Sequence, residues 1–256
     1  MRGRSLPWVL LAAALLAEGA LAAARPPQLA LGLRHAIFDT WQRWQPRRPG
    51  SAVVRVIDID EQSLARLGQW PWSRARLGEL LLRAHALGAR ALALDIALAE
   101  PDRTAPRRLA EQWQADPGLA RALAALPDPD AQLADALGRL PVATGFILTA
   151  QPGGRAPRAA AGFAFAGDPP AALPSYAGAV TALPALEAAA PGNGAFNFTP
   201  DADGVVRRLP LLLRLDAALY PSLAAEALRL AEGARSYAVR SGAGGVRALR
   251  VGTREL

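Results

Sequence analysis

The chain has 256 residues and a formal net charge of +7, and it contains no lysine and no cysteine. Without lysine it has no P-loop, no Schiff-base amine and no lysine to neutralise a phosphoaspartate; without cysteine it has no thiol nucleophile, no thiolate zinc site and no disulfide. The length allows one sizeable core, and the missing cysteine leaves the redox compartment open.

The positive charge is concentrated near the N-terminus. Residues 1–50 hold +5 of the net charge around a hydrophobic segment, and the rest of the chain carries only +2. A nucleic-acid-binding protein is expected to carry a basic stripe with interleaved aromatic residues on its folded part. We therefore expect no nucleic-acid partner.

The hydrophobic segment LPWVLLAAALLAEGALAAA, residues 6–24, is apolar apart from Glu18 and follows Arg2 and Arg4. As a helix it would span about 28 Å, which is enough to cross a bilayer. The small residues at 20–24 also fit the cleavage site of a secretory signal. We expect residues 1–24 to be either a membrane anchor or a cleaved signal, and both place the folded domain on the outer (periplasmic) side of the cell membrane.

Residues 25–51 form a proline-containing linker around the amphipathic stretch LALGLRHAIFDTWQRW. This stretch predicts a juxtamembrane helix, and its aromatic residues fit either the membrane interface or packing on the domain. The folded domain is expected to cover residues 52–256. The large apolar residues that recur at helical spacing in the stretch are Leu33, Ile37, Phe38, Trp41 and Trp44.

Strands and helices alternate at the start of the domain. AVVRVIDI (52–59) predicts a buried strand, and ARALALDIAL (89–98) predicts the next. Between them we expect a short helix over Glu61–Leu67 and a helix that Ser73 caps and Gly88 ends. Two apolar strands joined by helices make a right-handed crossover, so the sheet is expected to be parallel.

The later part of the chain predicts further helices and strands. The expected elements, in chain order, are an excursion at 100–129 with a short helix at 119–126, a helix from Asp130 to Leu137, a strand at 141–148, a mobile low-complexity loop at 150–180, two strands within 194–215 around the turn Pro200–Gly204, a helix from Ser222 to Glu232, and a final hairpin at 236–252.

The fold class that these elements predict is α/β. We expect a mostly parallel central sheet with flanking helices, antiparallel hairpin additions toward the C-terminus, and one hydrophobic helix at the N-terminus.

Five residues are candidates for ligand contact. Asp58, Asp60 and Asp95 lie at or near the carboxyl ends of the two predicted strands, where ligands bind in open α/β sheets and where carboxylates can hold Mg²⁺ or act as acid and base. Trp70 and Trp72 could form a stacking wall. Simpler roles are favoured for three of the five, because Asp60 is placed to cap the short helix and the two tryptophans, around Pro71, suit a hydrophobic plug on a turn.

Several catalytic and metal sites are not favoured. The Asp-x-Asp pair lacks the lysine and the following residues of a haloacid-dehalogenase-type phosphatase. The turn Asp201–Gly204 lacks two acids of a calcium loop, and His35 and His85 form no local metal pair or catalytic triad. Gly242 to Gly245 lie between strands, which is typical of a turn. We expect no catalytic residue, no metal and no cofactor.

Four stretches of the chain resemble the extracellular sensory domains associated with cyclases and histidine kinases, the CHASE domains, of the second type. The stretches are FDTWQRWQPRRP, VVRVIDIDEQSLARLGQWPWSRARLGELLLRAHALGARALALDIALAEPD, DAQLADAL and GAFNFTPDADGVVRRLPLLLRLDAALYPSLAAEAL. Together they span residues 36–232. Because the chain ends at Leu256, before the last part of such a domain and the membrane helices that follow it, we expect a truncated member of the family.

The resemblance implies a bacterial sensory domain outside the cytoplasm, tethered by an N-terminal helix, which senses a small ligand of unknown identity. Members normally couple to a cytoplasmic cyclase or kinase, which this chain lacks. The partners expected are therefore a small molecule and the membrane, and a homodimer is left open. Two alternatives remain: a secreted metal-dependent hydrolase that uses the strand-end aspartates, and a periplasmic interaction module without a ligand.

Overall fold

The computed structural model describes residues 28–46, 54–168, 173–242 and 245–256. The chain divides into two compact units, Met1–Asp60 and Glu61–Leu256. The described part of the first unit contains helix α2 (Gln28–Trp44), which confirms the helix predicted in the linker. The predicted hydrophobic helix at 6–24 lies outside the described residues. Within the described ranges, no helix combines the length and the apolar character needed to cross a membrane.

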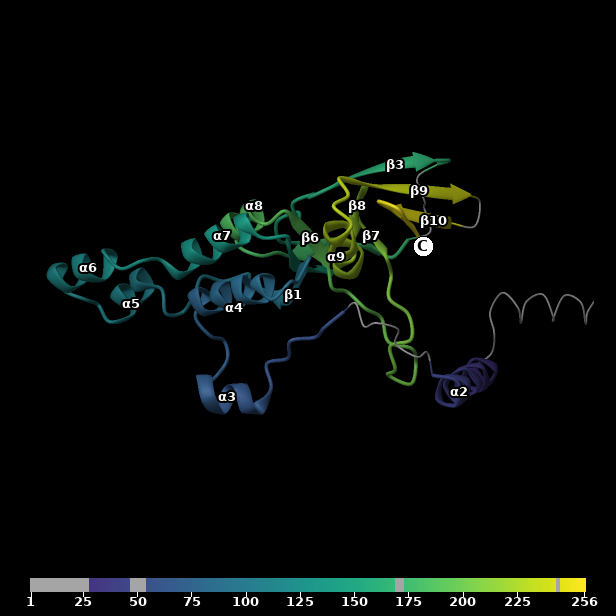
Figure 1. Ribbon diagram of the computed structural model, residues 1–256, viewed down its shortest axis with the longest axis horizontal. Helices are drawn as coiled ribbons and strands as arrows, with labels where there is room; N and C mark the ends of the chain where they lie inside the picture. Colours follow the sequence, from purple (N-terminus) through teal and green to yellow (C-terminus); the bar gives the residue numbers. More distant parts are fainter. Residues whose placement is uncertain (1–27, 47–53, 169–172, 243–244) are drawn as a thin grey trace, which may run out of the picture. The chain divides into compact units, whose positions relative to one another are not determined.

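The second unit contains both helices and strands (Figure 1). Its helices are α3 (Glu61–Leu67), α4 (Arg74–Ala86), α5 (Pro106–Gln112), α6 (Pro117–Ala124), α7 (Pro129–Arg139), α8 (Pro184–Ala189) and α9 (Leu223–Ala231). Its strands are β1 (Leu92–Ala97), β2 (Val142–Thr149), β3 (Gly162–Ala166), β4 (Ser175–Tyr176), β5 (Gly178–Val180), β6 (Gly192–Ala195), β7 (Leu212–Leu215), β8 (Ala218–Pro221), β9 (Ser236–Gly242), β10 (Gly245–Val251) and β11 (Arg254–Glu255).

The central sheet is mostly parallel, which confirms the predicted fold class. Strand β2 pairs in parallel with β1 and with β6, while β5 runs antiparallel to the end of β2. Gly145 of β2 explains how closely these strands approach: a Cβ there would lie 2.4 Å from the carbonyl oxygen of Leu94 on β1. The crossover from β1 to β2 passes through α5, α6 and α7.

Two smaller sheets complete the unit. The hairpin of β9 and β10 was predicted, and the structure confirms both strands; β3 pairs with β9, and β11 pairs with β10. The third sheet contains β4, β7 and β8, with β7 and β8 antiparallel. The antiparallel additions toward the C-terminus are therefore present.

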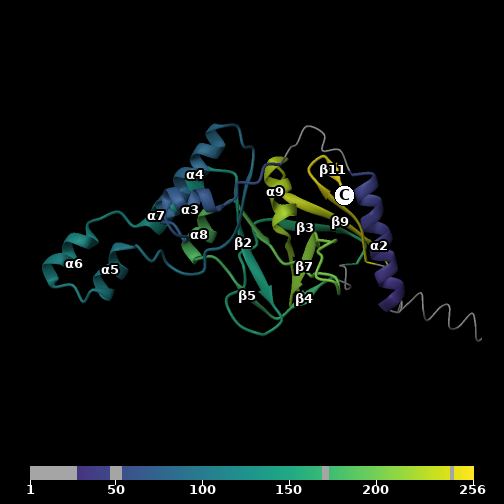
Figure 2. The ribbon, with the colours of Figure 1, turned by 90° about the horizontal axis from the view of Figure 1, so that it is seen from below.

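Three buried clusters form the core. One joins α4, α7 and α8 to β1 and the start of β2, and Figure 2 shows these helices grouped together. A second packs the end of β2 against β7 and β8, with the Phe146 ring edge-on to Tyr220 at 5.6 Å between centroids. The third joins α9 to β9 and β10 around the fully buried Tyr237. All side chains of the three clusters belong to the second unit.

The strand predicted at 52–59 is wrong for the residues that the structure describes. Residues 54–59 form no regular secondary structure, and Val54 and Val56 are 78% and 88% exposed. A run of branched apolar residues becomes a strand only when a neighbouring strand supplies the hydrogen-bond ladder. The parallel crossover is instead made by β1 and β2, and Asp60 ends the first unit.

Two other predictions are corrected. The loop predicted at 150–180 contains β3, β4 and β5. These strands have only five, two and three residues, which is too short for a clear apolar period even though Phe163 and Phe165 alternate with small residues in β3. The two strands predicted within 194–215 do not form a hairpin with each other, because β6 pairs with β2 and β7 pairs with β4 and β8. Only glycine fits at position 194 of β6, because a Cβ there would lie 2.6 Å from the Cα of Leu223 at the start of α9.

Candidate functional site

The predicted acidic residues are accessible in the structure. Asp58 and Asp60 are exposed in the first unit, and α3 begins directly after Asp60, which agrees with the predicted start of that helix. Asp95 is exposed on β1 in the second unit, where it makes no hydrogen bond or ion pair with any residue that the structure describes. Ligand contact by these three carboxylates stays a prediction.

The predicted tryptophans contact each other. The rings of Trp70 and Trp72 meet edge-on with 5.7 Å between centroids, and the indole N–H of Trp72 donates a hydrogen bond of 2.8 Å to the Gly68 carbonyl. Pro71 lies between them in a cis peptide bond. This local packing is what a plug on a turn requires, while a stacking role for a ligand stays a prediction.

A buried polar cluster lies at the carboxyl edge of β1 and β2, and the sequence did not predict it. We call Arg74, Asp102 and Asp130 the edge cluster. Arg74 opens α4, Asp102 follows β1, and Asp130 lies in the first turn of α7. Because α4 and α7 each precede a strand of the parallel sheet, their N-termini meet at this edge, so the positive ends of two helix dipoles point toward these carboxylates.

The hydrogen bonds of the edge cluster join three segments. The backbone N–H of Arg74 donates to Asp102 Oδ2 at 2.6 Å, and the backbone N–H of Asp102 donates to Asp130 Oδ2 at 2.9 Å. Asp102 Oδ1 accepts from the backbone N–H and the hydroxyl of Thr104. The α4 cap therefore comes from a distant carboxylate, and the backbone amides at the start of α4 make no hydrogen bond to the predicted Ser73 side chain. Asp128 caps α7 by accepting from the Asp130 amide, so this helix begins before Asp130, where the sequence predicted its start.

The two carboxyls of the edge cluster differ in proton affinity. Burial by itself raises the pKa of Asp102, but the amides of Arg74 and Thr104 outweigh it and hold the pKa below its usual value. Burial raises the pKa of Asp130 above its usual value, and the Asp102 amide and the Arg74 charge offset this only partly. Arg74 Nε and Asp130 Oδ1 face each other at 3.7 Å, and neither atom makes a hydrogen bond in the described residues. Most of the carboxylate oxygens of the cluster thus accept hydrogen bonds, and these bonds hold α4, α7 and the loop after β1 together.

A second buried polar cluster is centred on Asn193 of β6. Its side-chain amide donates to Glu187 Oε1 at 2.7 Å and to the Arg158 carbonyl, and its backbone N–H donates to Glu226 Oε1 at 3.1 Å. The Thr144 hydroxyl donates to its side-chain oxygen. Every polar group of the Asn193 side chain is satisfied, which fixes β6 between α8 and α9.

The two buried glutamates of this cluster bind arginines. Glu226 is fully buried and forms two hydrogen bonds with Arg229, of 2.7 and 2.9 Å, and accepts another from the Tyr237 hydroxyl. Glu187 forms an ion pair with Arg155, and Arg158 donates to the Glu187 carbonyl at 2.7 Å. These contacts hold residues 155–158 against α8, so this part of the predicted mobile loop is anchored in the structure.

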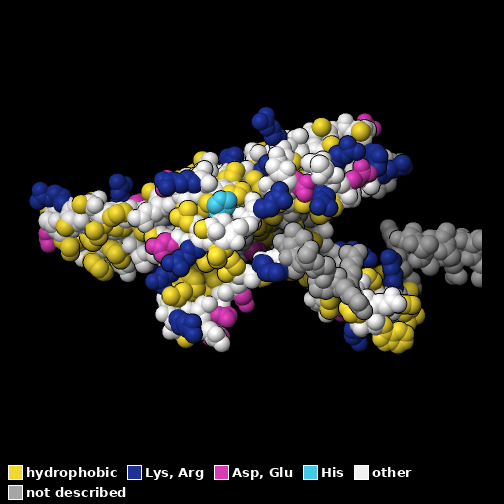
Figure 3. Space-filling model, viewed as in Figure 1, with side chains coloured by type: hydrophobic (Ala, Val, Ile, Leu, Met, Phe, Trp, Pro, Cys, Tyr) yellow, Lys and Arg dark blue, Asp and Glu magenta, His cyan; other side chains and the backbone are white. Residues whose placement is uncertain are grey.

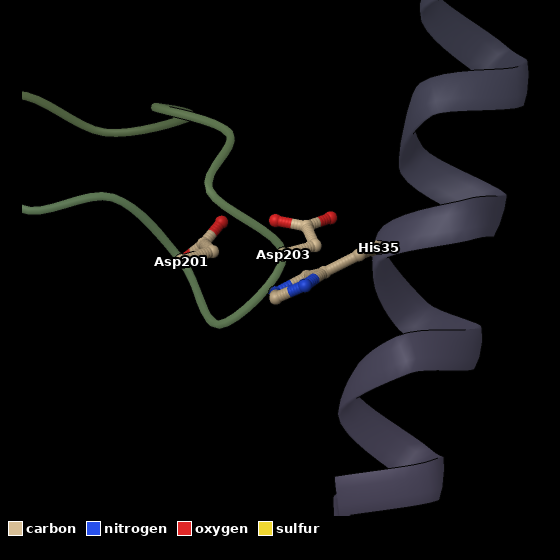
Figure 4. Close-up of side chains that lie close together, drawn as sticks. All are labelled: His35, Asp201 and Asp203. Carbon is tan, nitrogen blue, oxygen red and sulfur yellow. The ribbon is translucent and has the colours of Figure 1, made fainter.

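The turn at 201–204 is held together by an arginine. The Gly204 amide donates to the Asp201 carbonyl, and Asp201 and Asp203, which Figure 4 shows on this turn, both form ion pairs with Arg207. The hydrogen bond from Arg207 lowers the pKa of Asp203 well below its usual value. A guanidinium thus balances the two carboxylates within the turn. The predicted turn is confirmed, while the hairpin predicted around it is not formed.

A cavity of about 340 Å³ lies in the second unit, away from the predicted site residues. This volume is at the lower end of the range for small-molecule sites. Of the lining side chains only that of Arg247 carries a charge. The lining residues are Leu173, Pro174, Pro210, Leu211, Leu212, Val246, Arg247, Ala248, Leu249 and Leu256.

The edge cluster joins two of the four stretches that carried the family resemblance: Arg74 and Asp102 belong to the stretch that ends in AEPD, and Asp130 opens DAQLADAL. A family model described as CHASE2 domain matches residues 9–254, nearly the whole chain. The chain belongs to the CHASE2 domain family. CHASE2 is a family of extracellular sensory domains and not a catalytic family, so the predicted resemblance is confirmed. No curated protein and no solved structure matches this CHASE2 chain.

Proposed function

We propose that this CHASE2 chain is a membrane-tethered sensory domain of a bacterial signalling protein. Residues 6–24 hold it on the outer, periplasmic face of the cell membrane, where it binds a small ligand and relays a conformational change to a cytoplasmic cyclase or kinase. The CHASE2 match over residues 9–254 is the observation that carries this proposal. The apolar run at 6–24 supports the tether.

Two places in the domain are candidates for the ligand, and they favour opposite charges. The exposed carboxylate of Asp95 on β1 would attract a cationic ligand. The apolar cavity beside Arg247 would take a molecule with an apolar body and an anionic group such as a carboxylate. The charge of the ligand therefore indicates which place it occupies.

A thermal-shift screen of the purified chain tests the sensory role. Cationic and anionic metabolites are added in separate pools, because a ligand that binds only the folded state raises the melting temperature. We expect one class of compound to raise it in a saturable way. Arg247→Gln should abolish the shift of an anionic apolar ligand, and Asp95→Asn should abolish that of a cationic one. Each variant is the control for the other.

Two results would contradict a ligand-binding role. If no compound shifts the melting temperature of the well-folded chain, the domain is an interaction module without a small ligand. If the chain turns over substrates in a hydrolase screen with Mg²⁺, and Asp58→Asn removes the turnover, it is an enzyme. The edge cluster favours neither chemistry, because backbone amides bind one oxygen of Asp102 and one of Asp130, while Thr104 and Arg74 face the other two.

A further inference from the structure

Helix α2 has one strongly apolar face. Over its 17 residues, Leu33, Ile37, Trp41 and Trp44 follow one another at spacings of four, four and three, which places them on one side of a helix with 100° per residue. Phe38 adjoins this row. We call these five residues the α2 apolar face. Its side chains are between 46% and 77% exposed, and Figure 3 shows hydrophobic side chains on the surface of α2.

The other residues of α2 are mostly polar, with Leu29 and Leu31 as further apolar residues near its start. Arg34 lies within the arc of the α2 apolar face, where its long side chain can reach the headgroups. Gln42 lies on the side of the helix away from Ile37, and the Thr40 hydroxyl donates to the Ala36 carbonyl within the helix. The rings of Trp41 and Trp44 meet edge-on with 6.4 Å between centroids, so they form one continuous aromatic surface. A helix with Trp, Phe and Leu on one face and polar and basic groups on the other is typical of a segment that lies in a membrane interface.

The chain keeps α2 close to the predicted membrane segment. Only residues 25–27 separate residue 24 from the start of α2, and four residue steps cover at most about 14 Å. The first turn of α2 must therefore lie at the headgroup level if residues 6–24 cross the bilayer. Arg34 and Arg43 of the helix, and Arg47 and Arg48 after it, supply charges for anionic headgroups.

We propose that α2 lies in the outer interface of the membrane with the α2 apolar face in the lipid. This inference rests on the proposed tether by residues 6–24. It assigns α2 the role of connecting the membrane segment to the sensory domain. A change in the domain would reach the membrane segment through the depth and orientation of this helix.

The test places single labels on adjacent residues of α2. The chain contains no cysteine, so Ile37→Cys, Trp41→Cys, Ala36→Cys and Gln42→Cys each give one site for a spin label. All four side chains are exposed in the structure. A difference in label accessibility between neighbouring positions 36 and 37, or 41 and 42, would therefore arise from contact with lipid and not from burial in the protein. The full chain is placed in vesicles of phosphatidylethanolamine and phosphatidylglycerol, and collisions with oxygen and with a water-soluble nickel chelate are compared.

We expect the ratio of oxygen to nickel collisions to be several-fold higher at positions 37 and 41 than at 36 and 42. Equal ratios in a chain that resists alkaline extraction from the vesicles would overturn the inference and leave the tether standing. A chain that is washed from the vesicles would overturn both. If label 37 is shielded from both reagents and Ile37→Cys forms a disulfide between copies in high yield, a second copy covers the α2 apolar face and the inference is wrong.

Discussion

Asp102 shows how one carboxylate can join elements that are distant in the sequence. It caps α4 through the Arg74 amide and connects to α7 through Asp130. An N-cap aspartate replaced by alanine costs about 1 kcal/mol, and a buried partner left unsatisfied adds about 1 to 3 kcal/mol. The effect of such a residue therefore depends on its burial as well as on its capping geometry.

Replacing Asp102 by alanine should lower the free energy of unfolding by about 3 kcal/mol, measured by urea denaturation. The matched control is Asp116→Ala. Asp116 caps α6 in the same way, with its carboxylate accepting from the Gly118 and Leu119 amides, but it is exposed at the solvent side of a short helix. We expect a loss well below that of Asp102. Equal losses would show that the edge cluster contributes only an ordinary cap.

The burial of Tyr237 makes the stability of the fold depend on pH in the alkaline range. Burial, followed by the charge of Glu226, raises the pKa of its hydroxyl far above the usual value near 10. A raised pKa favours the neutral form, so this contribution to stability is complete below about pH 10 and is lost as the pH rises from there toward the pKa of the folded state.

We expect the urea midpoint to fall above about pH 10 and the tyrosinate absorbance of Tyr237 to appear only as the chain unfolds. The chain suits this measurement because it has only three tyrosines and no lysine that would titrate in the same range. The Tyr237→Phe variant should show a smaller fall of the midpoint with pH. An early tyrosinate signal from Tyr237 in the folded chain would contradict the buried hydrogen bond to Glu226.

At the scale of elements, the segment 155–158 depends on Glu187 of α8. Removing the charge by Glu187→Gln keeps the side-chain shape but weakens the ion pair with Arg155, so the segment should open more often. Trypsin cleaves after arginine, and we expect cleavage after Arg155 to become several-fold faster. The control is Glu111→Gln on the exposed surface of α5, which should leave the rate unchanged. An unchanged rate in Glu187→Gln would mean that backbone contacts alone hold the segment.

Most elements with a clear apolar period could be predicted from the sequence. The residues of β1, β2, α4, α9, β9 and β10 lie within or close to the predicted ranges, because their side chains alternate or repeat as strands and helices require. The strand β6 begins two residues before the predicted strand at 194 and pairs with β2 and not with the strand after the turn, since the sequence GNGA resembles a turn. Its small residues fit a narrow gap between β2 and α9 that exists only in the folded chain.

At the scale of the whole molecule, the buried side chains of the described residues all lie between Arg74 and Val251, within the second unit. We therefore expect a chain that starts at Glu61 to fold cooperatively with a melting temperature close to that of the full chain. Calorimetry and circular dichroism of the two chains provide the comparison. A shorter chain that unfolds at a much lower temperature would show that residues before Glu61 complete the folded unit.

The sequence by itself determined the family, the α/β class and the positions of the strongly periodic elements. The local sequence also identified the apolar segment at 6–24 and the amphipathic stretch of α2, because both patterns depend only on residues that are close together in the chain. Only the tertiary structure decided which polar residues meet. Arg74, Asp102 and Asp130 come together because parallel strands place the starts of α4 and α7 at one edge, and Asn193 binds Glu187 and Glu226 because β6 inserts between two helices. Such contacts depend on chain topology, which no local pattern specifies.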